Sequence, residues 1–310
     1  MLKIPKIENR MKFIYGGFLK RSVDRNSILF ESFHGKEISD SPLAMAQALQ
    51  RSDEGRGFKV FFSTDNADRD RKVTEALGLD VQLVDIHSKE YALALATCGF
   101  LVNNSSFPSY FIRREGQHYM QTWHGTPLKT LGKSMPYDIQ SMYNVQHNFI
   151  QADMLTFPNE FTRDVILRDY NLTDIITGKV IMCGYPRNSI FFDRQGDKDL
   201  KKRLGDEDIE TFAYMPTWRG QSNQDIDKDD YNEEVGKLLA TIDETLTDRQ
   251  KLYVNFHPIV QKSIRLGNYN HIFPFPKDVE KYEFLNCIDA LVTDYSSVPF
   301  PMRRLEANHT

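Results

Sequence analysis

Cysteine is scarce in this 310-residue sequence, which limits the kinds of site that it can form. The three cysteines, Cys98, Cys183 and Cys287, lie far apart, and each sits in an apolar run. An odd number of widely spaced cysteines fits neither a disulfide framework nor a zinc site. The sequence therefore predicts buried free thiols, which are typical of a protein in a reducing cytosol.

Long apolar runs and a surplus of basic residues are lacking too. No run approaches the roughly 20 apolar residues that span a bilayer, and the N-terminus lacks the small-residue cleavage site of a signal peptide. A net charge of −4 argues against a nucleic-acid partner. No spacing of metal-ligating residues stands out, so the sequence indicates no cofactor and only leaves a divalent ion open.

The first 27 residues, in contrast, are basic and amphipathic. They carry seven Lys or Arg against two acidic residues, with apolar side chains interleaved. Such a segment can lie on an anionic membrane surface, which would place the protein at the inner face of the cell membrane. A solvated N-terminal arm explains the same pattern, so both interpretations stand.

From Ile28 onward, short apolar runs alternate with helix-like stretches. This alternation predicts βαβ units and a mainly parallel sheet. Residues 193–234 interrupt it with 13 Asp or Glu against seven Lys or Arg. We therefore expect two Rossmann-like domains, over residues 28–192 and 211–310, joined by a linker over 193–210.

The pattern also gives the expected elements by residue range. The strands are 28–33, 58–63, 81–86, 100–103, 119–123, 154–157 and 180–183, then 211–216, 252–256, 271–273 and 290–293. The helices are 42–50, 69–77, 89–97, 139–152 and 160–170, then 231–246 and 279–286. Polar motifs that follow these strands matter most, because ligands of open parallel sheets bind beyond the carboxyl ends of the strands.

The first such motif is Trp123-His124-Gly125-Thr126-Pro127. A histidine at this place can act as a general base near neutral pH. Gly125 permits close approach of the backbone, and Pro127 fixes the exit of the loop. The alternative is a histidine that packs and bonds locally.

Three further motifs offer groups suited to phosphate. Thr217 and Arg219 follow the strand over 211–216, and a guanidinium matches phosphate oxygens. His257 ends the next strand and can stabilise charge on a leaving group. The hydroxyls and amides of Thr293-Asp294-Tyr295-Ser296-Ser297 suit an anion. The alternatives are a loop anchor with local ion pairs, a locally bonded histidine and an ordinary helix cap.

Together and in this order, these segments resemble the signature blocks of the CDP-glycerol glycerophosphotransferase family, which includes teichoic acid primases and polymerases and related capsule enzymes. Five ordered blocks are far more specific than any one motif. The blocks are Trp123–Lys129, Gly184–Asn188, Pro216–Arg219, His257–Pro258 and Thr293–Ser297.

The resemblance implies an α/β fold of the GT-B type, with two Rossmann-like domains facing a cleft and the donor nucleotide bound mainly by the second. It implies transfer of a polyol phosphate, glycerol or ribitol, from a CDP-polyol such as CDP-glycerol to a hydroxyl of a lipid-linked teichoic-acid or capsule-type polymer, with release of CMP. The partners implied are this donor, this acceptor and the anionic membrane surface.

The resemblance also implies roles for individual residues. His124 would be the catalytic base and His257 a second catalytic residue beside the donor phosphates. The expected donor-binding residues are Thr217, Arg219, Thr293, Asp294, Ser296 and Ser297. Further residues of the family's motifs are Gly125, Thr126, Pro127, Arg187 and Asn188.

The sequence departs from the family pattern at two places. Ser189 follows Asn188 where the family usually has Asp. After Ser297 the family pattern gives way to Val298-Pro299, and the second half has four expected strands where such a sheet carries about six. We therefore expect the second domain to be truncated, which puts the activity of this chain in question.

Two other functions fit parts of the pattern. One is a GT-B glycosyltransferase that uses a nucleotide sugar. The other is a truncated, non-catalytic paralogue that binds polymer or membrane through its first domain.

Overall fold

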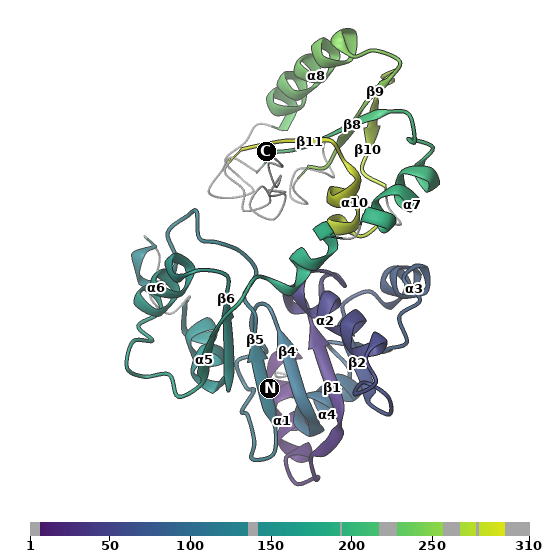
Figure 1. Cartoon of the computed structure of the whole chain (residues 1–310). Helices are drawn as coiled ribbons and strands as arrows, with labels where there is room; N and C mark the ends of the chain where they lie inside the picture. Colours follow the sequence, from purple (N-terminus) through teal and green to yellow (C-terminus); the bar gives the residue numbers. More distant parts are fainter. Residues whose placement is uncertain are drawn as a thin grey trace, which may run out of the picture. The chain divides into compact units, whose positions relative to one another are not determined.

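The computed structural model describes residues 7–135, 142–192, 194–216, 228–256, 267–276 and 279–294. The chain divides into two compact units, Met1–Ser189 and Ile190–Thr310. Each unit is an α/β structure built on its own parallel sheet (Figure 1). The α/β class predicted from the alternating pattern is thus confirmed for both.

The first unit contains a sheet of seven strands, and every strand pair in it is parallel. The strand order is β3-β2-β1-β4-β5-β6-β7, so the direction of winding reverses between β1 and β4. All seven strands expected in this half are confirmed. They are β1 (Asp24–Glu31), β2 (Lys59–Thr64), β3 (Gln82–Asp85), β4 (Cys98–Asn103), β5 (His118–Gln121), β6 (Met154–Phe157) and β7 (Lys179–Met182).

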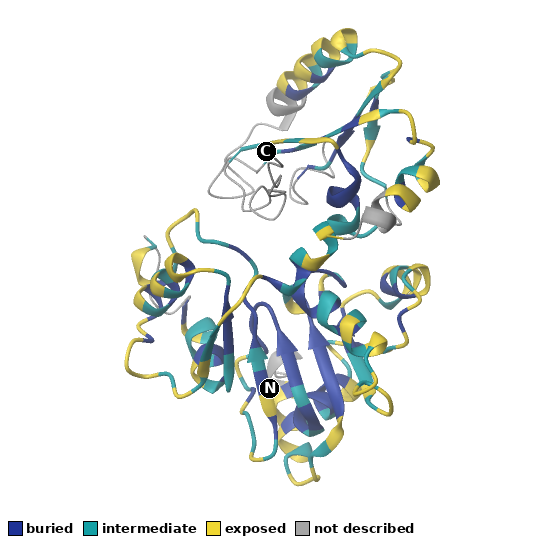
Figure 2. Cartoon of the chain, in the orientation of Figure 1, coloured by how far each residue is buried: buried dark blue, intermediate teal, exposed yellow. Residues whose placement is uncertain are grey.

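Two hydrophobic cores lie on the two faces of this sheet. Leu29 of β1 packs into the larger core, whereas its neighbours Ile28 and Phe30 pack into the other, because successive side chains of a strand point to opposite faces. Figure 2 shows that the central strands are buried along most of their length. The helices of this unit are α1 (Ile7–Phe18), α2 (Asp40–Arg51), α3 (Ala67–Ala76), α4 (Lys89–Thr97), α5 (Tyr143–Gln151) and α6 (Glu160–Asp169), with short 3-10 turns η1 (Phe33–Gly35) and η2 (Gly132–Ser134).

The N-terminal segment is not simply an arm. Helix α1 packs against α4, and its Met11 and Tyr15 are buried in the larger core. The Tyr15 hydroxyl donates a hydrogen bond to the Ile112 carbonyl at 2.9 Å. Most of the apolar side chains that made the segment look amphipathic therefore serve its own domain. Phe13 is the exception, with 77% of its surface exposed.

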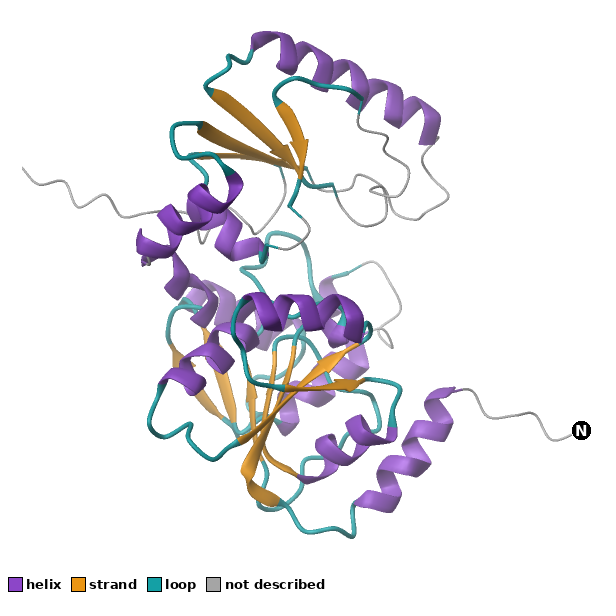
Figure 3. Cartoon of the chain, turned by 90° about the vertical axis from the view of Figure 1, so that its right-hand side faces the viewer, coloured by secondary structure: helices purple, strands orange, loops and turns teal. Residues whose placement is uncertain are grey.

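The second unit contains a four-stranded parallel sheet with the order β10-β9-β8-β11. Figure 3 shows the strands of this sheet in orange and the helices beside it in purple. The four strands expected here are confirmed. The elements are α7 (Arg194–Leu204), β8 (Glu210–Met215), α8 (Lys228–Thr245), β9 (Gln250–Val254), β10 (Ile272–Pro274), α10 (Lys281–Cys287) and β11 (Ala290–Thr293), preceded by the 3-10 turn η4 (Pro186–Phe192).

The expectation of a linker over residues 193–210 is wrong in part. Most of that stretch is helix α7, whose Leu200 is buried among residues of α10 and the sheet. Asp206, within the acidic cluster, is also buried, and it accepts hydrogen bonds from Lys251 Nζ and from the Tyr253 hydroxyl. A count of charges along the sequence does not reveal such pairing, because the partners come from a distant strand.

The cysteine prediction also needs a correction. Cys98 and Cys287 are buried, but Cys183 is exposed. Cys183 directly follows β7, which is an edge strand of the first sheet. An edge strand has a neighbouring strand on one side only, so residues at its end are less covered than those of central strands. Among the described helices, none has the length and apolar character needed to cross a bilayer.

Candidate active site

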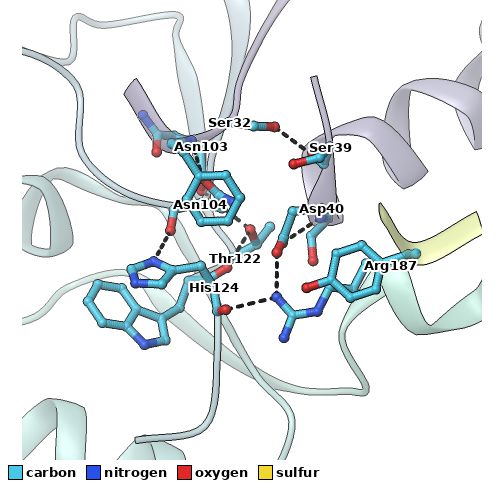
Figure 4. A network of polar contacts seen from close by, with 12 residues as sticks. Ser32, Ser39, Asp40, Asn103, Asn104, Thr122, His124 and Arg187 are labelled. Carbon is cyan, nitrogen blue, oxygen red and sulfur yellow. Dashed lines mark hydrogen bonds and ion pairs between the residues drawn. The ribbon is translucent and has the colours of Figure 1, made fainter. Parts of the chain in front are cut away.

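The polar motifs of the first unit gather where the winding of the sheet reverses. The loops that follow β1, β4 and β5 all leave the sheet at its carboxyl edge, and β4 lies between the other two strands. In open parallel sheets this reversal point is where ligands bind. Figure 4 shows the side chains that these loops bring together.

His124 is held in place by a strained residue before it. Trp123 adopts the left-handed region with φ +54°, although it is not glycine. Its amide donates to the Gln121 side-chain oxygen at 2.9 Å, and its ring is buried against Phe149. A bulky residue keeps such a conformation only where its surroundings fix it, and these positions cluster at functional sites.

The ring of His124 has a defined orientation and tautomer. Its Nδ1 lies 2.7 Å from the backbone carbonyl oxygen of Asn104. A carbonyl oxygen only accepts, so Nδ1 carries the proton and Nε2 is the basic nitrogen. The ring also lies against Trp123, with 4.1 Å between centroids, and edge-on to Phe33 at 5.7 Å.

Burial lowers the pKa of His124, because it penalises the imidazolium form. The Asn104 carbonyl and the Asp40 carboxylate raise this pKa, whereas Arg187 and His34 lower it. The net direction keeps the imidazole neutral near physiological pH. A neutral imidazole with an open Nε2 is what a general base requires.

A buried network of hydrogen bonds links the strand ends next to this histidine. Asn103, at the end of β4, donates its side-chain amide to the Glu31 carboxyl at 3.1 Å. Its backbone carbonyl accepts from the Thr122 amide at 2.9 Å. Gln121 donates to the Ser105 carbonyl at 2.7 Å. Hydrogen bonds thus connect the carboxyl ends of β1, β4 and β5, the strands whose loops form the site.

The loop between β1 and α2 closes the other side of the site. The Phe33 amide donates to the Asn104 side-chain oxygen at 2.9 Å, and the Ser32 hydroxyl donates to the Ser39 carbonyl at 2.6 Å. Gly35 has φ +76°, and a Cβ there would lie 2.6 Å from Ile86 Cγ2. Only glycine fits this turn without a shift of its neighbours.

An ion pair lies beside the histidine loop. Arg187 Nη1 lies 2.5 Å from Asp40 Oδ2 and donates to the His124 carbonyl oxygen at 2.9 Å (Figure 4). Both side chains are buried, with 3% and 0% of their surfaces exposed. The Arg187 guanidinium also stacks on the ring of Tyr185 at 4.2 Å.

The other predicted motif residues of the first unit lie nearby in the chain. Gly125 is buried, and Thr126 and Pro127 are half-buried, directly after His124. Asn188 lies in η4, where its amide donates to the Tyr185 carbonyl at 2.9 Å. The structure therefore brings His124 and Arg187 into contact through a backbone carbonyl, a pairing that the sequence does not predict.

In the second unit, three motifs begin at one edge of the sheet. Strands β8, β9 and β11 are parallel, and β8 lies between the other two. Their carboxyl ends are followed by Pro216, Asn255 and Asp294, and the Thr293 hydroxyl donates to the Met215 carbonyl at 2.6 Å. The predicted residues that come next lie outside the described part of the chain. They are Thr217, Arg219, His257, Ser296 and Ser297.

Sequence reasoning missed Asp40 as a site residue. Its neighbours Ser41 and Pro42 indicate only a helix start, and its partner Arg187 lies 147 positions away. Among the described residues, no group of three or more His, Cys, Asp or Glu side chains is placed to hold a metal ion.

Comparison with known proteins supports the family prediction. Among curated proteins, the teichoic acid poly(glycerol phosphate) polymerase of Staphylococcus epidermidis is 28% identical over 295 residues, which are 90% of this chain and 39% of that protein. The polymerase of the same name from Bacillus spizizenii is 28% identical over 90% of this chain and 71% of its own length. The teichoic acid glycerol-phosphate transferase of Staphylococcus aureus is 28% identical over 91% and 72%. The chain thus spans well under half of the first relative and about seven tenths of the others.

Solved structures give the same picture for the fold. The wall teichoic acid polymerase TagF matches with a TM-score of 0.74 and 26% identity over 95% of this chain and 72% of that one. A TagF variant soaked with CDPG matches with a TM-score of 0.77 and 26% identity, at the same coverage. A UDP-GlcNAc 2-epimerase from Neisseria meningitidis, at 11% identity and a TM-score of 0.53, shares the fold alone. The GT-B type of α/β fold is confirmed by these neighbours.

The match to a family model decides the assignment. The model for CDP-Glycerol:Poly(glycerophosphate) glycerophosphotransferase matches residues 14–304, which is nearly the whole chain. The match includes the segments that hold His124, Arg187 and Asp294. The chain therefore belongs to the CDP-glycerol:poly(glycerophosphate) glycerophosphotransferase family.

Proposed function

We propose that this chain moves glycerol phosphate from CDP-glycerol to a hydroxyl of a teichoic-acid-type polymer and releases CMP. Its relatives are named as glycerol-phosphate polymerases and transferases, and a TagF variant was soaked with CDPG. The structural observation that carries the proposal is His124, whose Nδ1 is bonded to a carbonyl at the reversal point of the sheet. This arrangement leaves Nε2 as the base.

His124 is the catalytic base of the proposed reaction. Its Nε2 takes the proton of the acceptor hydroxyl as that oxygen attacks the phosphorus that bears the glycerol. A new P–O bond forms to the acceptor, and the P–O bond to CMP breaks on the opposite side. CMP leaves with the bonding electron pair, and the proton on His124 passes to solvent. In phosphoryl transfer, positioning and charge stabilisation supply most of the rate.

The donor nucleotide belongs to the second unit in this proposal. Ligands of parallel sheets bind beyond the carboxyl ends of strands, and three family motifs start at that edge of the second sheet. We assign the donor phosphates to Thr217, Arg219, Thr293, Ser296 and Ser297, with Asp294 beside them. His257 stabilises the charge that develops on the departing CMP.

The acceptor is proposed to be lipid-linked, and the protein to lie at the inner face of the membrane. Helix α1 and the turn after it expose Lys12, Phe13, Lys20 and Arg21. Exposed basic side chains and an exposed aromatic ring on one short segment favour contact with anionic lipid. Sedimentation with vesicles of anionic phospholipid tests this contact. Equal binding to vesicles of neutral lipid would contradict it.

The reaction is tested by the nucleotide that is released. Purified protein is incubated with CDP-glycerol and an acceptor polymer, and separately with UDP-sugars and the same polymer. We expect CMP in the first case and no UDP in the second. Release of UDP would favour a nucleotide-sugar transferase, and release of neither would favour a binding protein without catalysis.

A further inference from the structure

We propose that Asp40 and Arg187 form a buried ion pair that positions His124 for its work as the base. The two residues are positioning residues, since they act on His124 through its backbone carbonyl oxygen. Arg187 anchors the carbonyl of His124, and Asp40 anchors Arg187. This inference rests on the proposed function of His124.

Three contacts define the pair. Arg187 Nη1 donates both to Asp40 and to the His124 carbonyl oxygen. Asp40 accepts the amide of Ser41 with its other carboxyl oxygen, at 2.6 Å. The carboxylate thus sits at the N-terminus of helix α2, where a negative charge is stabilised. These contacts therefore link helix α2, through Asp40 and Arg187, to the backbone of the loop that holds His124.

The backbone of Asp40 indicates that this arrangement is enforced. Asp40 has φ +64°, in the left-handed region that a non-glycine residue adopts at a cost. Four non-glycine residues of this site, Phe33, His34, Asp40 and Trp123, therefore have a positive φ. Tyr185 covers the guanidinium and is itself 6% exposed. The ion pair that anchors His124 is thus buried, and electrostatic interactions are stronger in a buried setting than in water.

The pair also has a defined electrostatic effect on the histidine. Three charged or titratable groups act on the pKa of His124: Asp40 from α2 raises it, whereas Arg187 from η4 and His34 from the β1–α2 loop lower it. Asp40 and Arg187 have opposite effects and are both present, so they offset each other. Removal of either charge alone should therefore move the pKa of His124, and in opposite directions.

The test combines a pH titration of His124, which needs no substrate, with a measurement of the rate of CMP release. The ring signals of the eight histidines are followed by NMR against pH in the full chain, and His124→Gln identifies the signal of His124. The variants are Asp40→Asn, Arg187→Gln, Arg187→Lys and the double variant Asp40→Asn/Arg187→Gln. The kcat and KM for CMP release from CDP-glycerol are then measured for each.

The expected titration results differ in sign. Asp40→Asn lowers the pKa of His124, Arg187→Gln raises it, and the double variant and Arg187→Lys return it toward the wild-type value. In the rate assay, Arg187→Gln and the double variant lose about 10²-fold in kcat with unchanged KM, because the loop loses its anchor. Arg187→Lys, which keeps the charge and one contact, recovers part of that loss.

A buried carboxylate that pairs with an arginine elsewhere in the same unit supplies the control. Asp70 of α3 is 1% exposed and pairs with Arg69 at 2.7 Å. It is not among the groups that act on His124. Asp70→Asn should therefore leave the pKa of His124 and the kcat unchanged, even if it lowers stability.

Either of two results would overturn the inference. The first is a pKa of His124 that moves in the same direction, or not at all, in folded Asp40→Asn and Arg187→Gln. The second, which applies if the single variants do not fold, is a folded double variant with wild-type kcat. Opposite pKa shifts in a protein that releases no CMP would instead contradict the proposed function and leave the pairing intact.

Discussion

The backbone carbonyl oxygen of Asn104 accepts a hydrogen bond from Nδ1 of His124, over a distance of 2.7 Å. The two residues follow neighbouring parallel strands, β4 and β5, so the sheet itself sets the direction of the ring. Because Asn104 contributes a main-chain atom, its side chain is free to bond the Phe33 amide of the β1–α2 loop. One residue thus joins three loops at the reversal point of the sheet.

The lowered pKa of His124 predicts the pH dependence of the reaction. Burial lowers this pKa below the usual histidine value of 6.5. The base works when neutral, so CMP release should persist as the pH falls through 6.5 and disappear only at a lower pH. A profile of kcat/KM against pH measures this limb. A limb at or above the usual value would contradict the assignment of His124 as base in its buried setting.

Glu31 should make the first unit less stable as the pH rises. Burial raises its pKa from 4.5 to about 7. Between these values the folded chain holds a proton that the unfolded chain has released, so stability falls across that window. Relative to Glu31→Gln, the wild type should lose about 3 kcal/mol between pH 4 and pH 8. Urea unfolding at both pH values measures the difference, and a constant difference would refute the prediction.

The packing of α1 predicts contrasting effects of two aromatic substitutions. Tyr15→Ala should cost about 3–5 kcal/mol in the free energy of unfolding, because it empties a buried site. Phe13→Ala should change stability by no more than about 0.5 kcal/mol, since the side chain is exposed. Denaturant unfolding of both variants checks this. Equal costs would mean that α1 does not pack as described.

Much of the fold could be predicted from periodicity alone. The apolar runs marked all eleven strands of the described residues, because buried strands of parallel sheets leave continuous apolar stretches. The pattern did not indicate helices α1 and α7. Charged residues predominate in α7, whose only apolar side chains are Leu200 and Leu204, and α1 lies in the basic N-terminal segment, although its Met11, Ile14, Tyr15 and Phe18 pack in or against the larger core.

The site divides in a similar way. His124 could be predicted because a strand, a histidine and a glycine follow one another in the chain. The Asp40–Arg187 pair could not: Arg187 belongs to a family motif, but Asp40 lies on a different element 147 residues away and shows only a helix start beside it. Glu31 and Asn103 look like ordinary strand ends until the neighbouring strands bring their side chains together.

The donor assignment in the second unit predicts an effect on binding. If Arg219 holds the donor phosphates with two hydrogen bonds, Arg219→Lys should raise the KM for CDP-glycerol about tenfold or more, because charged hydrogen bonds contribute about 1.5–3 kcal/mol. Lys228→Arg, at the start of α8, is the matched exchange of one basic residue for the other outside the motif. An unchanged KM in Arg219→Lys would remove this residue from the donor site.

The most direct test of the account is CMP release by His124→Asn, with His118→Asn as its control. His118 is exposed at the opposite end of the same strand, β5, so its loss should change neither the fold nor the rate. We predict that His124→Asn keeps the circular dichroism spectrum and loses about 10²–10⁴-fold in kcat. A folded His124→Asn variant that releases CMP from CDP-glycerol at the wild-type rate would contradict the account.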